Sequence, residues 1–232
     1  MKILALESSA KAASAALWED GKLLGQYWQG SGLTHSRTLL AMTEDLLKNL
    51  ETKIEDIDAV AVAKGPGSFT GIRIGVAAAK GLAWGADKPI IGVSTLESMA
   101  YHLIDREDCV ICPVMDARRS QVYNAKFTSE KGQLKRLCPD RAVSVAELIE
   151  EAKVDGKTYF LVGDGAEMCY NIMSEQGVSV LLAPENLRLQ SAWGVAMASI
   201  GAEAVSPDDL VPNYLRLSQA ERERLERQQN SN

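Results

Sequence analysis

The sequence is poor in the residues that most often bind metals or form disulfides. Its two histidines, His35 and His102, lie far apart and outside any HxxxH or HExxH pattern. Four cysteines in 232 residues are too few for a disulfide scaffold, so we expect a reducing cytoplasm. Cys109 and Cys112 form a CxxC pattern inside an apolar run, which favours buried strand thiols over redox or metal chemistry.

Long apolar runs and an excess of positive charge are also missing. No stretch approaches the ~18 apolar residues of a membrane span, and the apolar start before Glu7 is too short for a signal peptide. The formal net charge is −6, whereas proteins that bind nucleic acid by themselves usually carry a basic face. We therefore expect no membrane span, and the charge disfavours direct binding to nucleic acid.

What the sequence does have is a repeated order of elements. The first copy predicts strands at 2–8, 13–20 and 23–29, a helix at 34–50, a strand at 57–64, a helix at about 70–85, a strand at 88–93 and a helix at 94–104. The second predicts strands at 109–117, 120–128 and 134–138, a helix at 144–152, a strand at 158–163, a helix at 164–177, a strand at 178–183 and a helix at 190–204.

This duplicated βββαβαβα order predicts an α/β fold of two facing lobes, as in actin-like (ASKHA) and sugar-kinase-like proteins. We expect an N-terminal lobe at 1–104 that carries a partner interface, and a C-terminal lobe at 105–189. A helix at about 190–205 is expected to join the first lobe. Residues 206–232 read as an irregular strap, broken by prolines, and a polar tail.

A turn with three glycines and a proline, KGPGSFTGIRIG at residues 64–75, separates a predicted strand from a predicted helix. Such a turn can bind an anion through the free amide groups of the helix start. The candidate nucleotide- or phosphate-binding residues are Gly65, Gly67, Ser68, Gly71 and, in the second copy, Asp116. The stretch matches neither GxGxxG nor the Walker pattern, so a tight turn with a close-packed helix start remains equally open.

Carboxylates follow three of the predicted strands. Glu7 and Asp116 stand at equivalent places in the two copies, and Asp164 opens a later turn. Metal or phosphate chemistry is one interpretation of such positions. A plain charge cluster at a hairpin end, made by Asp116 with Arg118 and Arg119, is the other. Because the sequence also lacks a Gly-x-Ser-x-Gly motif, we predict no catalytic residue and no metal ligand.

The helix at about 70–85 is apolar on nearly every side. Ile72, Val76, Ala79 and Ala83 share one side and are expected to face the lobe's own sheet. Apolar and small residues elsewhere on this helix, and an apolar arc on helix 34–50, predict a partner-binding surface, with a fully internal helix pair as the alternative. The candidate interface residues are Leu39, Met42, Leu46, Ile74, Ala77, Ala78, Gly81 and Trp84.

Three stretches resemble one known family. They are GPGSFTGIRIG at 65–75, MDARRSQVY at 115–123 and VPNYLR at 211–216. Together they make the chain similar, over nearly its whole length, to the TsaB (YeaZ) family of bacterial cytoplasmic proteins. That family belongs to the machinery that makes N6-threonylcarbamoyladenosine (t6A) at position 37 of tRNAs reading ANN codons. The resemblance implies an actin-like fold.

The resemblance also implies partners. In the family, TsaB pairs through its first-lobe helices with TsaD, the catalytic subunit that transfers the threonylcarbamoyl group, and the ATPase TsaE joins the pair. TsaB alone forms homodimers through the same surface. The implied contact with tRNA is through the complex only. No intrinsic cofactor is implied, and ATP or ADP is expected, if at all, at the junction with the partner subunit.

TsaD-type sequences carry a metal-binding HxxxH, and its two ligand positions align here with Thr95 and Met99. Neither residue replaces imidazole at an iron or zinc site. The resemblance therefore implies a non-catalytic scaffold that activates TsaD. The alternative is an active enzyme of the actin-like superfamily, either an ATP-dependent kinase or a glycoprotease-like metallopeptidase.

Overall fold

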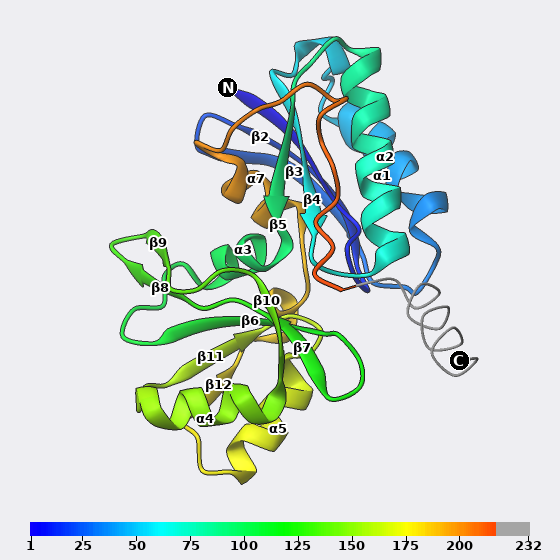
Figure 1. Cartoon of the computed structure of the whole chain (residues 1–232). Coiled ribbons are helices and arrows are strands. Elements are labelled where there is room, and N and C mark those ends of the chain that lie inside the picture. The colour runs from blue at the N-terminus through cyan, green and yellow to red at the C-terminus, as the bar shows by residue number, and fades with distance from the viewer. Residues whose placement is uncertain (217–232) are drawn as a thin grey trace, which may run out of the picture.

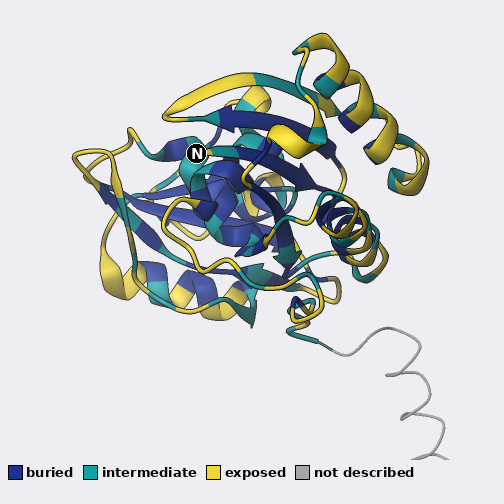
Figure 2. Ribbon diagram, turned by 90° about the horizontal axis from the view of Figure 1, so that it is seen from above, coloured by how far each residue is buried: buried dark blue, intermediate teal, exposed yellow. Residues whose placement is uncertain are grey.

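The computed structural model describes residues 1–216, so the polar tail expected beyond Arg216 lies outside the described residues. The chain forms two α/β lobes, each built around one mixed sheet (Figure 1). Buried residues gather in the strands, and exposed residues lie mainly on the outer sides of the helices (Figure 2). The predicted two-lobed α/β fold is confirmed. None of the helices within residues 1–216 is long and apolar enough to cross a bilayer.

The first lobe is a five-stranded sheet in the order β3-β2-β1-β4-β5. Its strands are β1 (Lys2–Glu7), β2 (Ala13–Glu19), β3 (Lys22–Gln29), β4 (Ala59–Gly65) and β5 (Ile90–Ser94). The central strands β1, β4 and β5 run parallel, and β2 is antiparallel to both neighbours. Helices α1 (His35–Asn49) and α2 (Phe69–Gly85) cover one face of this sheet, and a short 3-10 turn, Ile54–Asp56, precedes β4.

The second lobe repeats that order as β10-β7-β6-β11-β12. Its strands are β6 (Val110–Asp116), β7 (Gln121–Asn124), β10 (Arg141–Ser144), β11 (Tyr159–Val162) and β12 (Val180–Leu182). A hairpin of β8 (Phe127–Glu130) and β9 (Gln133–Arg136) pairs with β6 beside the main path. Helices α4 (Val145–Asp155) and α5 (Ala166–Glu175) pack on this sheet, and the single turn α6 (Glu185–Arg188) follows β12.

The second lobe differs from its predicted strands in two ways. The place equivalent to β3 is taken by β10, which the sequence analysis missed, whereas the predicted strand 134–138 falls on β9 of the hairpin. The predicted strand 120–128 breaks after Asn124. The buried amide of Asn124 donates to the Pro113 and Ala125 carbonyls, both at 3.0 Å, and so holds the chain where it leaves the sheet. The alternation of apolar and polar residues continues through residues 120–128, so the sequence does not reveal this break.

Two helices cross between the lobes. Helix α3 (Thr95–Ala100), extended by a 3-10 turn at Tyr101–Leu103, follows β5 but packs its apolar residues against the second sheet. Helix α7 (Ala192–Ser199) follows the second lobe but packs against the free face of the first sheet. At their crossing, a Cβ on Gly194 would lie 2.2 Å from the Ser98 carbonyl oxygen, so the two backbones are as close as glycine allows.

The chain then returns over the first lobe as an extended strap, residues 205–216, as predicted (Figure 1). Val205 bridges to Ile90 at the start of β5. Further along, the Asn213 N–H donates to the Lys64 carbonyl at 2.7 Å. At its end the Arg216 guanidinium donates to the Ala117 carbonyl of the second lobe at 2.6 Å. The strap therefore ties one lobe to the other.

Candidate functional site

The glycine turn between β4 and α2 is packed against the chain's own backbone. A Cβ on Gly65, whose φ is +119°, would lie 2.3 Å from the Asn213 carbonyl oxygen of the strap. A Cβ on Gly67 would lie 2.4 Å from the Ser9 carbonyl oxygen, and one on Gly71 would lie 2.2 Å from the Ser8 carbonyl oxygen. Packing against the strap and against the turn after β1 thus accounts for all three glycines.

Ser68 begins α2 and is also bonded within the lobe. Its hydroxyl accepts the Gly71 N–H at 3.3 Å, and its own N–H donates to the Ser9 carbonyl at 2.7 Å. These bonds use groups that an anion would otherwise approach. Phosphate binding at this turn stays a prediction, and the close-packed helix start is the interpretation that the contacts favour.

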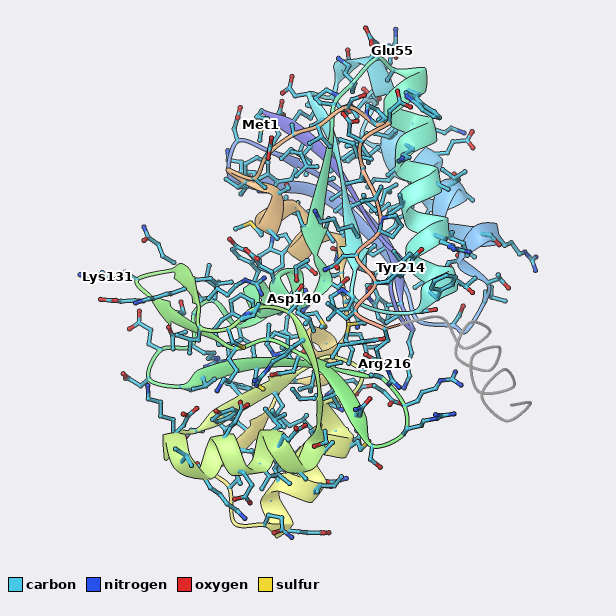
Figure 3. The ribbon with its side chains drawn as sticks, viewed as in Figure 1. Met1, Glu55, Lys131, Asp140, Tyr214 and Arg216 are labelled. Carbon is cyan, nitrogen blue, oxygen red and sulfur yellow. The ribbon has the colours of Figure 1, made fainter. Side chains whose placement is uncertain are left out.

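A cleft of about 630 Å³ lies between the lobes at the mouth of this turn. The first lobe contributes Lys11 and the start of α2, and the second contributes the ends of β6 and β11. The strap closes one side, where Tyr214 and Arg216 lie between the lobes (Figure 3). The structure therefore brings Gly67, Ser68 and Asp116 to one cleft. Gly65 and Gly71 do not line it and are buried.

The two equivalent carboxylates at this cleft have opposite surroundings. Glu7 is fully buried, does not line the cleft, and accepts the Ser9 N–H. Burial raises the pKa of Glu7 from its usual 4.5 to about 7. Asp116 is exposed and accepts the Arg118 N–H at 2.7 Å within the β6–β7 turn. This contact agrees with the hairpin-end interpretation of Asp116.

Asp164, the third strand-end carboxylate, is half-buried, and it accepts the side-chain amide of Gln190 at 3.3 Å. Burial raises the pKa of Asp164. Gln190 precedes α7, so this bond adds a link between the turn after β11 and the helix that covers the first sheet. Asp164 thus helps to hold the two lobes together through its bond to Gln190, and it also lines the cleft.

The positions aligned with the metal ligands of TsaD-type sequences do not fit a metal. Thr95 and Met99 are both fully buried, and Met99 packs in the apolar cluster between α3 and the second sheet. His102 is committed elsewhere, because its Nδ1 donates to the Leu187 carbonyl and its Nε2 accepts the Ser191 hydroxyl, each at 2.8 Å. Residues 1–216 contain no group of three His, Cys, Asp or Glu side chains placed to hold a metal.

The cysteines of the CxxC pattern are buried thiols, as predicted. Cys112 lies on β6 beside the amide of Asn124, and burial raises the pKa of its thiol. Burial likewise raises the pKa of Cys169, on α5, to about 12. Burial thus favours the neutral thiol in both, which disfavours a role as a nucleophile.

The candidate interface residues divide into core and surface. Leu39 and Leu46 on α1 are each 1% exposed and belong to the lobe's own core, and Met42 is half-buried against the same core. This corrects the sequence-based assignment of Leu39 and Leu46 to a partner surface. The apolar arc of α1 points at the sheet, and a helical wheel does not tell an arc that meets a sheet from one that meets a partner.

Helix α2 keeps the surface that the sequence assigned to it. Its predicted inner side, Ile72, Val76, Ala79 and Ala83, is buried. On the outer side Ala77, Gly81 and Trp84 are exposed, and Ile74 and Ala78 are half-buried. Trp84 is 57% exposed. A Cβ on Gly81 or Gly85 would meet no atom within 4 Å. Nothing within the described chain therefore requires a glycine at either position, although glycine weakens a helix interior by about 1 kcal/mol.

Several residues at this edge of the site were missed by the sequence analysis. Arg73 donates to the Tyr214 hydroxyl at 3.0 Å and places its guanidinium 3.9 Å from the centre of the Phe69 ring. The Phe69 and Tyr214 rings are in contact, with centroids 4.6 Å apart and planes tilted by 31°. This cluster fixes the strap on the first turn of α2, between the cleft and the outer face of the helix. Tyr214 lies 141 residues after Arg73, so no local pattern could reveal this contact.

Comparisons with known proteins agree with this architecture. The family model described as TsaD, tRNA N6-adenosine threonylcarbamoyltransferase, matches residues 31–223. The tRNA threonylcarbamoyladenosine biosynthesis protein TsaB of Bacillus subtilis is 34% identical, with 98% of this chain and 100% of that protein covered. The Escherichia coli TsaB is 34% identical over 77% of this chain and 78% of that protein.

Solved structures give the same result. YeaZ from Pseudomonas aeruginosa superposes with a TM-score of 0.76 at 26% identity, covering 92% of this chain and 99% of that chain. The ethanolamine utilization protein EutJ of Carboxydothermus hydrogenoformans, with a TM-score of 0.51 at 12% identity, shares the fold alone over 85% of this chain and 90% of that chain. The predicted actin-like fold and the predicted family resemblance are both confirmed.

Proposed function

This chain belongs to the TsaB (YeaZ) family of tRNA threonylcarbamoyladenosine biosynthesis proteins, and we propose that it serves t6A formation as a non-catalytic subunit. Its role is to bind and activate a TsaD-type threonylcarbamoyltransferase, with a TsaE-type ATPase joining the pair. It contacts tRNA only as part of that complex, in the cytoplasm. Alone, it forms a homodimer through the surface that the transferase would occupy.

The observation that carries this proposal is the outer face of α2. Ala77, Gly81 and Gly85 leave room above the helix, and Trp84 projects beside them with more than half of its surface exposed. A partner helix that crosses here would approach the α2 backbone closely and bury the indole. Exposed glycines that the monomer does not need are explained if a second chain needs them.

The same face suits a specific protein partner better than solvent. Arg73 is the charged residue near the N-terminal end of α2, and it contacts Tyr214 and Phe69. Lys80 leans to the strap, where it donates to the Asp208 carbonyl at 3.3 Å. Both charges are thereby drawn away from the centre of the helix face. A specific interface buries about 800 Å² per partner, so the contact would extend from α2 to Met42 and exposed Leu40 on α1.

The absence of intrinsic catalysis is part of the proposal. Thr95 and Met99 supply no imidazole, and Cys109, Cys112 and Cys169 are buried thiols. The glycines of the turn are explained by packing. These contacts disfavour both a metallopeptidase and a kinase that act alone. ATP or ADP, where it takes part, would bind at the junction with the transferase, because the cleft between the lobes opens beside the first turn of α2.

Reconstitution tests the proposal. The chain is mixed with the TsaD-type and TsaE-type proteins of its host, with tRNA, ATP, threonine and bicarbonate, and with the enzyme that makes the threonylcarbamoyl adenylate. The t6A formed is measured by mass spectrometry of nucleosides. Omission of this chain should reduce t6A at least about 100-fold, and Trp84→Glu should act like omission. Ile172→Glu, on the outer side of α5, is the matched control and should leave t6A unchanged.

Two results would overturn it. One is full t6A formation without this chain. The other is ATP turnover, or a stoichiometric metal ion, in the purified chain without any companion. Trp84→Glu that still binds the transferase at full affinity would leave the t6A role standing and reject α2 as the interface.

A further inference from the structure

The outer edge of the first sheet is a strand without a neighbour. β3 pairs with β2 on one side, and no backbone–backbone bond joins residues 22–29 to any other part of the described chain. Proteins usually protect such an edge with charges, proline or a covering element. Here Lys22 is the sole charged residue of β3, and the strand has no proline. Leu23, Leu24 and Trp28 are instead 43%, 39% and 47% exposed.

Beside this edge lies an apolar groove of about 570 Å³. β3 forms one wall with Leu23 and Trp28, and Leu187, Leu189 and Trp193 from α6 and α7 form the other. The groove is on the α7 face of the sheet, opposite the face that α1 and α2 cover. It is therefore separate from the surface assigned to the transferase.

The polar groups that β3, His102 and the start of α7 bring to the groove are bonded within the chain. The Trp28 indole N–H donates to the Gln190 carbonyl at 3.0 Å, and the Gln26 side-chain oxygen accepts the Trp193 N–H at 2.8 Å. His102 is held by the Leu187 carbonyl and the Ser191 hydroxyl. The walls thus offer apolar contact, and the unpaired backbone of β3 supplies the free hydrogen-bonding groups.

The exposed area decides which kind of occupant fits. Leu23, Leu24 and Trp28 together offer roughly 300 Å² of side chain, well below the ~800 Å² per partner of a stable pair of globular proteins. A second copy would therefore be held poorly here. A short extended segment is different, because main-chain hydrogen bonds to the edge supply much of its affinity.

We propose that β3 and this groove bind an extended peptide segment of another protein, without acidic residues. The segment adds a sixth strand to the first sheet and places a large apolar or aromatic side chain between Trp28 and Leu187. The groove volume lies within the ~300–1,000 Å³ range of ligand sites, so it accommodates an aromatic ring. Acidic residues are excluded from the segment, because the carboxylate of Glu185 lines the groove and would repel a second carboxylate.

The test uses the full-length chain and phage-displayed random nonapeptides. Enriched sequences should lack acidic residues and share one aromatic position. A synthetic peptide of the best sequence should slow hydrogen exchange at residues 22–29 and change the Trp28 fluorescence. Of two versions N-methylated at alternate residues, one should bind normally and the other at least about 10-fold more weakly. Alternate N–H groups of a strand point to opposite edges, so only one set can pair with β3.

Leu24→Lys and, as a second variant, Leu23→Ser should each weaken the peptide at least about 10-fold. Leu181→Lys is the matched control, because Leu181 is 49% exposed on β12 of the other sheet; it should change nothing. The proposal falls if no sequence is enriched, if both N-methylated peptides bind equally, or if the β3 variants bind normally. It also falls if ultracentrifugation finds a dimer that Leu24→Lys dissociates, since the occupant is then a second copy.

Discussion

The two lobes share one topology but present different helices to the outside. In the first lobe, the outer face of α2 carries Ala77, Gly81 and Trp84, which are small or apolar. In the second, the corresponding helix α5 exposes Glu167, Asn171 and other polar residues, with Ile172 the exception. Both helices bury an apolar inner side against their own sheet. The two lobes thus share the same kind of core, whereas the outer face of α2 is small and apolar and that of α5 is mainly polar.

The strand ends beneath the cleft show a similar divergence. β1 ends at Glu7, which is buried, and β6 ends at Asp116, which is exposed. The turn after β1 is covered by the glycine turn, which packs on Ser8 and Ser9. No such cover lies over Asp116, whose turn stands at the mouth of the cleft. Two carboxylates at equivalent positions of a duplicated fold therefore differ in burial when a neighbouring segment covers only one of them.

The largest expected effect concerns the cores of the two lobes, which we expect to be equally sensitive to a buried charge. Leu39→Glu in α1 and Leu148→Glu in α4 each place a charge at a fully buried site. Each should lower the free energy of unfolding by on the order of 5 kcal/mol, enough to prevent folding. Circular dichroism and expression as soluble protein are the measurements. If the Leu39→Glu variant folds and loses only partner binding, Leu39 belongs to the interface and not to the core.

Next comes the contrast between α2 and α5 themselves. Trp84→Glu should weaken binding to the TsaD-type subunit by about 100-fold, because a charge replaces the exposed indole. The isolated monomer should keep its thermal stability. Ile172→Glu on α5 should alter neither property. Calorimetric titration measures the affinities. If both variants lose affinity equally, α2 is not a more specific binding surface than α5.

The buried and exposed carboxylates give a pH test. The pKa of Glu7 is about 7 in the folded chain and near 4.5 when unfolded. Between these values the unfolded chain loses its proton first, so the free energy of unfolding falls as pH rises through this window and levels off above it. The Glu7 contribution is on the order of 3 kcal/mol.

Glu7→Gln should remove this fall and leave the chain more stable than the wild type at pH 8. Denaturant unfolding from pH 4.5 to 8 measures it. Asp116→Asn makes the same chemical change at the exposed equivalent and should shift the free energy of unfolding by less than about 0.5 kcal/mol. A wild-type stability that does not decline between pH 4.5 and 7 would contradict the assignment to Glu7.

The smallest expected effect is that of Gly81→Ala, which should change monomer stability and partner affinity in opposite directions. Gly81→Ala should stabilise the monomer by about 1 kcal/mol, since alanine favours a helix and the added Cβ meets no atom. It should weaken binding of the partner by about 10-fold, because the partner helix needs that space. Asn171→Ala on α5 should also stabilise the monomer without affecting binding. If Gly81→Ala improves both stability and affinity, no close helix crossing occurs at Gly81.

The sequence predicted the fold well wherever the pattern was local. Periodicity placed α2 and separated its inner residues Ile72 and Val76 from its outer residues Ala77 and Trp84. It failed for Leu39 and Leu46, because both a sheet and a partner produce the same apolar arc on a helix. It failed for β10 because four residues carry too little alternation to be distinguished from a loop.

The cleft was predicted only in part, for a related reason. Gly67, Ser68 and Asp116 were recognised from their turns, and the structure brings them to one cavity. Arg73, Tyr214 and Arg216 were not recognised, because their contacts join segments about 100 or more residues apart. The glycines were correctly singled out as special, but the sequence could not say whether a ligand or the chain's own carbonyl groups approach them.

The exchange of α3 and α7 between the lobes has a consequence for how the protein is made. The free face of the first sheet is sealed by α7, whose residues are among the last of the described chain to be translated. Until residue 199 has emerged from the ribosome, Ile3, Ala5 and Ala16 have no cover. Folding of the N-terminal half can therefore be completed only after α7 has been synthesised, and a nascent chain stalled near residue 190 would expose this sheet face to chaperones.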